Sequence, residues 1–194
     1  MERGMGAGKI GLLLCSNCTI QLWRYIYDQL VGHDNGAYLR ESQRKAGKRI
    51  SDGAMVVLMD VGEPFNIHPP KKQEVASRFA YQALAQSYGL TGFESKSPDL
   101  EAVESKGSDL ELTFGDAPNG LILEGDYSHS FMIAGEDKIF YPAEVKINGN
   151  KIILKSARIK NPVAARYAFQ NYEQGTLFSS GGLPVSSFKT DDWD

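Results

Sequence analysis

Hydrophobic and polar residues follow two different patterns along the chain, and the change near residue 91 predicts two structural halves. In the first half, residues 54–59 form one continuous apolar run, which Asp60, Gly62 and Pro64 close. A short apolar run between turn signals predicts a buried strand. After residue 91, apolar and polar residues alternate, with turn residues at short intervals, and this spacing predicts an antiparallel β domain.

Two helices are predicted to flank the strand. From Lys72 onward, apolar residues recur at helical spacing until Gly89 ends the pattern; they are Val75, Ala76, Phe79, Ala80, Ala83 and Leu84. A shorter helix is predicted over residues 38–45, ending near Gly47. Its charged side chains are predicted to form a solvent-exposed face rather than a substrate clamp; they are Arg40, Glu41, Arg44 and Lys45.

The second half is best illustrated by a predicted hairpin. Centring a two-residue turn on Asn148-Gly149 pairs Val145 with Ile152 on an apolar face. Further strands are predicted at residues 110–114, 120–124, 131–133 and 163–169. A stretch rich in Gly, Ser, Lys and Pro at residues 89–97 is predicted to link the two halves.

His68 lies in a proline-rich loop between the predicted strand and the helix that follows it. Pro69 and Pro70 restrict the preceding residues to extended conformations. Loops at the carboxyl ends of strands in open α/β sheets bind ligands, and imidazole suits proton transfer near neutral pH. His68 is therefore a candidate catalytic base, while its spacing alone also fits a structural or merely exposed histidine.

A family resemblance is carried by several phrases of the sequence. They are Gly36-Ala-Tyr-Leu-Arg-Glu-Ser-Gln-Arg-Lys-Ala46, Gly53-Ala-Met-Val-Val-Leu-Met-Asp-Val-Gly-Glu-Pro64, Asn66-Ile-His-Pro69, Lys72-Gln-Glu-Val75, Phe131-Met-Ile-Ala-Gly-Glu-Asp-Lys138 and Gly182-Leu-Pro-Val-Ser-Ser-Phe-Lys-Thr-Asp-Asp-Trp193. From residue 35 to its end the chain resembles the carboxyl-terminal portion of the sialate O-acetylesterase family of SGNH-type carbohydrate esterases.

The resemblance implies both a fold and an activity. Residues 35–91 are expected to form an α/β fragment, the carboxyl-terminal part of an SGNH hydrolase layer, and residues 92–194 an antiparallel β-sandwich-like domain. The activity implied is hydrolysis of O-acetyl esters on sugars by a serine mechanism, in which His68 deprotonates the serine. The implied substrate is an O-acetylated carbohydrate, such as sialic acid or a plant polysaccharide-type sugar, and no cofactor or metal is expected.

The sequence departs from the family at two catalytic positions. The nucleophile of the family lies in a Gly-Gln-Ser-Asn-like segment far upstream, and nothing before residue 35 resembles it. The family usually has an aspartate two or three residues before the histidine, where this chain has Asn66 and Phe65. We therefore expect a truncated esterase without its nucleophile. The alternative is a non-catalytic β-domain remnant or a module that binds a carbohydrate or another partner.

The chain contains other residues that could in principle replace the missing aspartate and the missing serine nucleophile. Asp60 and Glu63 are carboxylates close to His68, but their spacing differs from that of the family. The serines nearest to plausible loops are Ser16, Ser51 and Ser77, and none lies in the sharp Gly-flanked turn that exposes a nucleophile.

Residues 1–34 form an atypical amino-terminal segment. They contain both cysteines, Cys15 and Cys18, at a C-x-x-C spacing that occurs in zinc sites and in redox motifs. The sequence offers only scattered histidines as further zinc ligands, and no βαβ context for a redox motif. A second explanation is a frame shift, because residues 12–24 can be encoded so that the next reading frame resembles the strand that precedes this region in the family. The codons of the gene test the frame shift, because in the shifted frame they must encode the family-like strand.

Composition excludes some classes of function. The net charge of −3 and the even spread of lysine and arginine argue against nucleic-acid binding. The chain has no apolar run near the roughly 20 residues that span a bilayer, and no export signal is readable. The compartment stays open, since members of the family often act outside the cytoplasm. A single strand leaves its sheet edges uncovered, so association through an uncovered edge is predicted.

Aromatic residues of the second half have two interpretations. Tyr127, Tyr141, Tyr167, Phe169, Tyr172 and Trp193 are available to bind sugar, but aromatics in alternating strands more often belong to the core. Arg166 and Tyr167 are predicted to brace the β domain against the α/β half, and Trp193 to pack back on that half. His129 is predicted to lie in an exposed turn.

Overall fold

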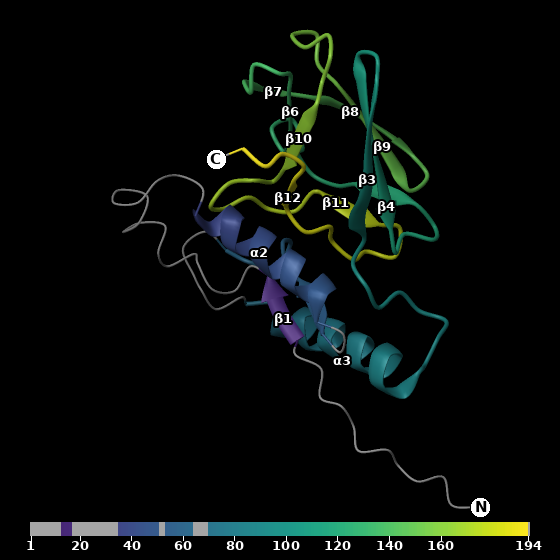
Figure 1. Ribbon diagram of the computed structural model, residues 1–194. Helices are drawn as coiled ribbons and strands as arrows, with labels where there is room; N and C mark the ends of the chain where they lie inside the picture. The colour runs from purple at the N-terminus through teal and green to yellow at the C-terminus, as the bar shows by residue number, and fades with distance from the viewer. Residues whose placement is uncertain (1–12, 17–34, 51–52, 64–69, 194) are drawn as a thin grey trace, which may run out of the picture.

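The computed structural model describes residues 13–16, 35–50, 53–63 and 70–193 (Figure 1). Its first part is a small α/β layer made of β1 (Leu13–Ser16), α2 (Asn35–Arg49), β2 (Ala54–Val57) and α3 (Lys72–Tyr88). β1 and β2 pair in parallel, with Leu13 opposite Ala54. The predicted lone strand was thus wrong, because β1 lies within the amino-terminal segment that the family resemblance did not cover.

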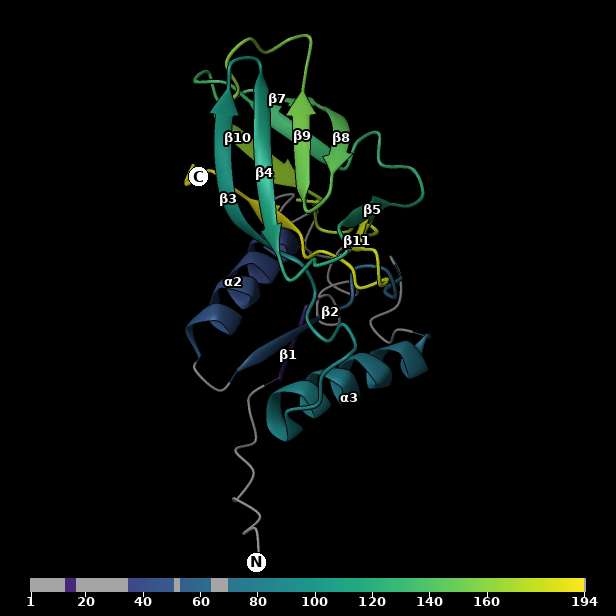
Figure 2. The same cartoon turned by 90° about the vertical axis from the view of Figure 1, so that its right-hand side faces the viewer.

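The segment from β2 to Val61 contributes to two apolar clusters. Val57 and Met59 belong to the main hydrophobic core, which they share with the β sheets. Val56 and Leu58 form a smaller cluster with Val61, and α3 packs against it. Figure 2 shows β1 and β2 between α3 and the β-rich part of the molecule. Successive side chains of this segment point to opposite faces, one toward the β domain and the other toward α3, so the segment joins the α/β layer to the β domain.

The β domain consists of ten strands. They are β3 (Asp99–Lys106), β4 (Asp109–Gly115), β5 (Leu121–Leu123), β6 (Phe131–Ala134), β7 (Phe140–Pro142), β8 (Glu144–Asn148), β9 (Lys151–Lys155), β10 (Ala164–Tyr167), β11 (Leu177–Ser179) and β12 (Phe188–Lys189). They form a sheet in the order β3-β4-β9-β8, another in the order β12-β10-β6-β7, and the pair β11-β5. Every pairing among them is antiparallel, as the alternating sequence predicted.

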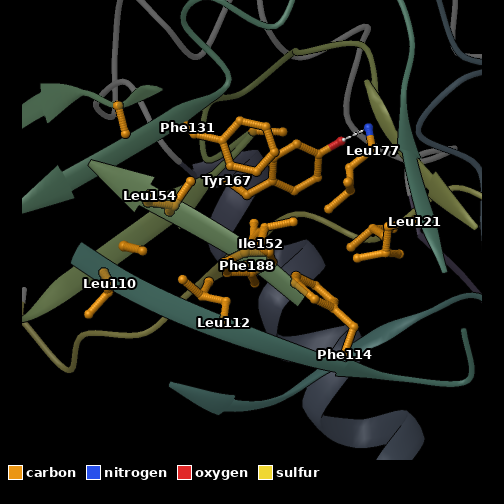
Figure 3. Close-up of a cluster of buried hydrophobic side chains, with 14 of the residues drawn as sticks. Leu110, Leu112, Phe114, Leu121, Phe131, Ile152, Leu154, Tyr167, Leu177 and Phe188 are labelled. Atoms are coloured by element: carbon orange, nitrogen blue, oxygen red, sulfur yellow. Dashed lines mark hydrogen bonds between the residues drawn. The ribbon is translucent and has the colours of Figure 1, made fainter. Parts of the chain in front are cut away.

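The main core lies between these sheets, with Tyr167 at its centre (Figure 3). The Tyr167 ring packs against Phe131 and Phe188, with ring centroids 4.7 and 5.6 Å away. Its hydroxyl oxygen accepts hydrogen bonds from the backbone N–H groups of Thr176 and Leu177, each 2.8 Å long. Burial raises the pKa of the Tyr167 hydroxyl, although these N–H groups oppose the rise. Tyr167 is thus a core residue.

The hairpin forms with a turn one residue later than predicted. Val145 pairs with Leu154 and Asn148 with Lys151, so Gly149 and Asn150 are the two turn residues. Gly149 has φ +61°, as the first turn residue of a type II′ turn requires, which explains the position of the glycine. The partner of Val145 is thus two residues further along than predicted. A shift of two residues leaves each side chain on the same face of the sheet, so the predicted apolar face is kept.

The charged face of α2 is the clearest error of the sequence interpretation. The helix extends through Gly47 to Arg49, and Arg40, Glu41 and Arg44 are buried rather than solvent-exposed. Only Lys45 keeps a largely exposed side chain. The two arginines face the β domain, which supplies hydrogen-bond acceptors for their guanidinium groups.

Arg40 is deeply buried, with 3% of the residue exposed. Its Nε donates to Ser187 Oγ (2.8 Å), and its Nη1 and Nη2 donate to the carbonyl oxygens of Asn171 and Ala168 (each 3.1 Å) and of Gln170. Burial lowers the pKa of the Arg40 guanidinium to about 10, and the charge of Glu173 opposes this, so the group stays charged at neutral pH. Arg40 therefore fastens α2 to the segment between β10 and β11.

Arg44 and Lys48 continue this row toward the end of α2. Arg44 makes two 2.8 Å hydrogen bonds to Glu41 and one of 2.8 Å to Asp99, and Lys48 Nζ lies 2.5 Å from Asp99 Oδ2. Burial disfavours the charged form of Arg44, but the Glu41 hydrogen bonds and the nearby charges of Asp99 and Glu41 raise its pKa. Arg40, Arg44 and Lys48 are four residues apart, so one face of the helix holds the β domain.

Gly175 lies where the backbone of the β domain comes close to the α/β layer. Its N–H donates to the Met59 carbonyl oxygen over 2.9 Å, and a β-carbon at this position would lie 2.8 Å from Met59 Cβ. Gly175→Ala is expected to lower the free energy of unfolding by about 1–3 kcal/mol, because the buried Met59 must move. Urea denaturation measures the loss. Gly135→Ala is the control, since a β-carbon there meets nothing closer than 3.5 Å, and an equal loss in both variants would contradict the explanation.

The contacts predicted between the halves are found in part. Arg166 pairs with the buried carboxylate of Asp191, Nε and Nη2 lying 2.9 and 2.8 Å from its oxygens. The end of its segment contacts α2, because the Ala168 carbonyl accepts from Arg40 and the Phe169 ring packs on Tyr38. Trp193 packs on Phe140 of β7, with ring centroids 5.8 Å apart. Lys189 does reach the α/β layer, as Ser187 does, and its Nζ lies 4.9 Å from the centre of the Tyr38 ring.

Candidate functional site

The carboxyl end of β2 leads to the loop of the predicted base. His68 itself, with Phe65 and Asn66, lies outside the described residues, so the structure does not test its assignment. The residues on either side of the loop are held together by an ion pair. Arg78 of α3 donates to both Asp60 oxygens over 2.7 and 2.6 Å, and to the Val57 carbonyl oxygen over 2.9 Å.

This ion pair involves one of the two carboxylates that lie close to His68 in the sequence. Both Asp60 oxygens accept hydrogen bonds from a bidentate arginine, a strong side-chain pairing. Arg78 thereby fixes the start of α3 against the end of β2. Sequence reasoning missed Arg78, because an arginine on an amphipathic helix gives no sign of a partner 18 residues earlier.

A hollow of about 610 Å³ opens beside this ion pair, where the α/β layer meets the β domain. We call it the first hollow. Asp60 and Lys71, the described residues on the two sides of the loop, both line it. From the β domain come Glu124, Asp126 and the segment that contains Gly175. The ends of the His68 loop therefore lie at a hollow large enough for a small ligand.

Glu173 forms one wall of the first hollow. Burial raises the pKa of its carboxyl group, while a hydrogen bond with Ser130 and the charges of Arg40 and His129 oppose the rise. A partly buried carboxyl group of raised pKa in a hollow is a feature common at functional sites. No sequence signal points to Glu173, because it lies in an irregular segment without a motif.

A second hollow of about 370 Å³ lies on the other side of Glu173. Its lining is partly aromatic and partly polar. The lining residues include His129, Phe140, Arg166, Phe169, Gln170 and Glu173. Ser130 lines both hollows together with Glu173. The two hollows therefore share a wall formed by this hydrogen-bonded pair.

His129, Ser130 and Glu173 have the composition of a catalytic triad but not its connections. In a triad the histidine lies between the serine and the acid and bonds to both. Here Ser130 bonds directly to Glu173, and only 3% of Ser130 is exposed. His129 lies in an exposed turn, as predicted. These three residues do not form a nucleophile with its base.

The three serines nearest to plausible loops are described only in part. Ser16 belongs to β1, Ser77 is half-buried on α3, and Ser51 lies outside the described residues. Cys15 is also in β1, while Cys18 lies outside the described part of the chain. In that described part, no group of three His, Cys, Asp or Glu residues is placed to hold a metal ion. No described helix is both long and apolar enough to cross a membrane.

Together, the parallel β1-β2 pair, its two helices and the antiparallel sheets have the fold of part of a carbohydrate esterase. One similar structure is that of XAC1771, a novel carbohydrate acetylesterase from Xanthomonas citri, with a TM-score of 0.82 and 30% sequence identity. The match covers 94% of this chain and 41% of that one, so this chain spans about two fifths of the length of its structural relative. No protein-family model matches the chain, and no curated protein matches it.

Proposed function

We propose that this chain provides the histidine-bearing part of a serine carbohydrate esterase that removes O-acetyl groups from sugars. His68 acts as the base that deprotonates the serine, and the first hollow receives the sugar. The serine and the oxyanion donors belong to a segment like the Gly-Gln-Ser-Asn-like block of the sialate O-acetylesterase family. The observation that carries the proposal is the likeness to a carbohydrate acetylesterase over 94% of the chain.

The site geometry supports this assignment in a second way. The loop of His68 leaves the carboxyl end of a strand in a parallel pair, where ligands bind in open α/β sheets. Asp60 before the loop and Lys71 after it line the first hollow, and the Asp60–Arg78 pair fixes α3 against the end of β2. A base on such a loop is positioned from both sides, which proton transfer requires.

The serine-bearing segment is proposed to dock along the uncovered edge of the small sheet. Among the described strands, β1 pairs only with β2, so its other edge is available for a further parallel strand. α3 is also only partly covered, because Val75 and Phe79 remain half-buried. A continued sheet would cover both, and the predicted association through the sheet edge is thus part of this proposal.

One observation favours the alternative of a non-catalytic carbohydrate-binding module. Asp60 is engaged by Arg78, and the position of the family's aspartate holds Asn66 or Phe65. If no other carboxylate orients His68, the imidazole is a weaker base, and binding without hydrolysis becomes the function of the hollows.

Hydrolysis of p-nitrophenyl acetate by the purified chain tests the proposal first. The chain alone is expected not to exceed the buffer rate, because a base without a nucleophile and oxyanion donors loses most of the rate enhancement. Joined to an upstream segment that contains the serine block, it is expected to release acetate from O-acetylated sugars. The proposal is wrong if the joined protein binds these sugars but releases no acetate. Activity of the chain alone that His68→Ala removes would instead place the serine within these 194 residues.

A further inference from the structure

The two hollows adjoin each other across Ser130 and Glu173, which line both of them, and we call the two hollows together the groove. At one end lie the residues beside the His68 loop, and at the other lies the aromatic part of the second hollow. A single acetylated sugar ring needs only the first hollow. The second hollow therefore offers room for the neighbouring ring of a longer sugar.

The second hollow combines the two kinds of group that a ligand pocket of this size uses, apolar surface and a few placed polar groups. Phe140 and Phe169 supply aromatic surface, and Gln170 and Glu173 supply hydrogen-bonding groups. Arg166 lies over the Phe140 ring, with its guanidinium carbon 4.3 Å from the ring centre. Its charge is already matched by the bidentate pair with Asp191. A ligand carboxylate would therefore gain little from Arg166.

The first hollow has an excess of negative charge. Setting aside the Asp60–Arg78 ion pair, three carboxylates line it against the single cation Lys71; they are Glu124, Asp126 and Glu173. Arg40 keeps its positive charge, since its hydrogen bonds go to Ser187 and to backbone carbonyl groups, and this charge acts on Glu173. The first hollow therefore has an excess of one negative charge. Like charges in one pocket repel an anionic ligand, and they do so most at low ionic strength.

We propose that the groove formed by the two hollows binds an uncharged O-acetylated sugar chain and discriminates against sugars that carry a carboxylate, such as sialic acid. This inference rests on the proposed esterase function and narrows its substrate class. The aromatic and amide groups of the second hollow hold the ring next to the acetylated one. The carboxylates of the first hollow accept hydrogen bonds from sugar hydroxyl groups and repel a sugar carboxylate.

A matched pair of ligands tests the charge selection directly. The methyl glycoside of N-acetylneuraminic acid carries a carboxylate, and its methyl ester has the same ring without the charge. A third probe is an O-acetylated xylo-oligosaccharide, which is uncharged. Each is titrated into the full chain labelled with ¹⁵N, and chemical-shift changes give the dissociation constant and the residues affected.

The uncharged probes are expected to bind about three- to tenfold more tightly than the acid at about 0.01 M salt, since a net charge of one at contact distance repels by about that amount in water. The difference is expected to shrink near 1 M salt, where the Debye length is about 3 Å. Shift changes are expected at Gly175 and Gln170, one in each hollow. Glu124→Gln is expected to narrow the difference, whereas Glu136→Gln, on an exposed turn elsewhere in the β domain, is expected to leave it unchanged.

Two results would overturn the inference. If the acid binds as tightly as its methyl ester at low salt, the groove does not select against charge, although the esterase proposal still stands on the acetate-release assay. If none of the three probes shifts residues of either hollow, the groove is not a sugar site. Failure of the esterase proposal looks different, because it appears as sugar binding without acetate release by the joined protein.

Discussion

Replacing His68 with alanine is expected to lower acetyl-ester hydrolysis by about 10⁴-fold or more in the protein formed by this chain and its serine-bearing segment. Without the imidazole the serine hydroxyl keeps its proton and is a poor nucleophile at neutral pH. The expected loss is in kcat rather than in KM, because His68 acts on the reacting proton and not on the bound sugar. Initial rates of p-nitrophenyl acetate hydrolysis measure it.

His129→Ala is the matched control for this variant. It makes the same replacement in an exposed turn beside the second hollow, which a small ester without a sugar does not need. Its rate on p-nitrophenyl acetate is expected to stay within about twofold of the unchanged protein. Equal losses in both variants, or a His68→Ala protein that keeps its rate, would remove His68 from the mechanism.

Arg40→Met is expected to lower the free energy of unfolding by about 3–5 kcal/mol, the largest stability effect we predict for a single replacement. Methionine keeps the apolar stem but removes every donor that Arg40 offers to Ser187 and to the carbonyl groups of Ala168, Gln170 and Asn171. A buried carbonyl oxygen that loses its donor costs about 1–3 kcal/mol. Urea denaturation followed by tryptophan fluorescence gives the change.

Arg49→Met provides the comparison on the same helix. Arg49 is exposed in the last turn of α2, so the identical replacement is expected to change stability by no more than about 0.5 kcal/mol. A loss below about 1 kcal/mol in Arg40→Met would show that water replaces the guanidinium, and that α2 does not depend on this contact.

The sequence predicted the regular elements best where local signals agree with tertiary packing. Helix α3 begins at Lys72 and ends before Gly89, whose φ of +67° is the left-handed conformation that glycine adopts easily. β4 and β9 alternate in burial as their sequences do. β3 was missed because it is an edge strand with mostly exposed residues, so no alternation marks it.

The contacts that position the site were largely invisible in the sequence. Arg40 and Arg44 were predicted to be solvated because a charged helix face looks the same whether water or a partner covers it. One signal was available: Arg40, Arg44 and Lys48 recur at intervals of four, which places three cations on one side of the helix. The contact of Glu173 with Ser130 depends on an irregular segment, for which periodicity gives no information. The role of His68 stays a prediction.

The position of Arg40 in the chain also has a consequence for biosynthesis. The nearest of its carbonyl partners lies 128 residues further along, and Ser187 lies 147 residues further. A ribosome adds about 5–20 residues per second, so α2 leaves it roughly 6 to 30 seconds before the segment that receives Arg40. During that interval the guanidinium has only water as its partner, and the nascent α/β layer depends on its own small sheet or on a chaperone until the last strands emerge.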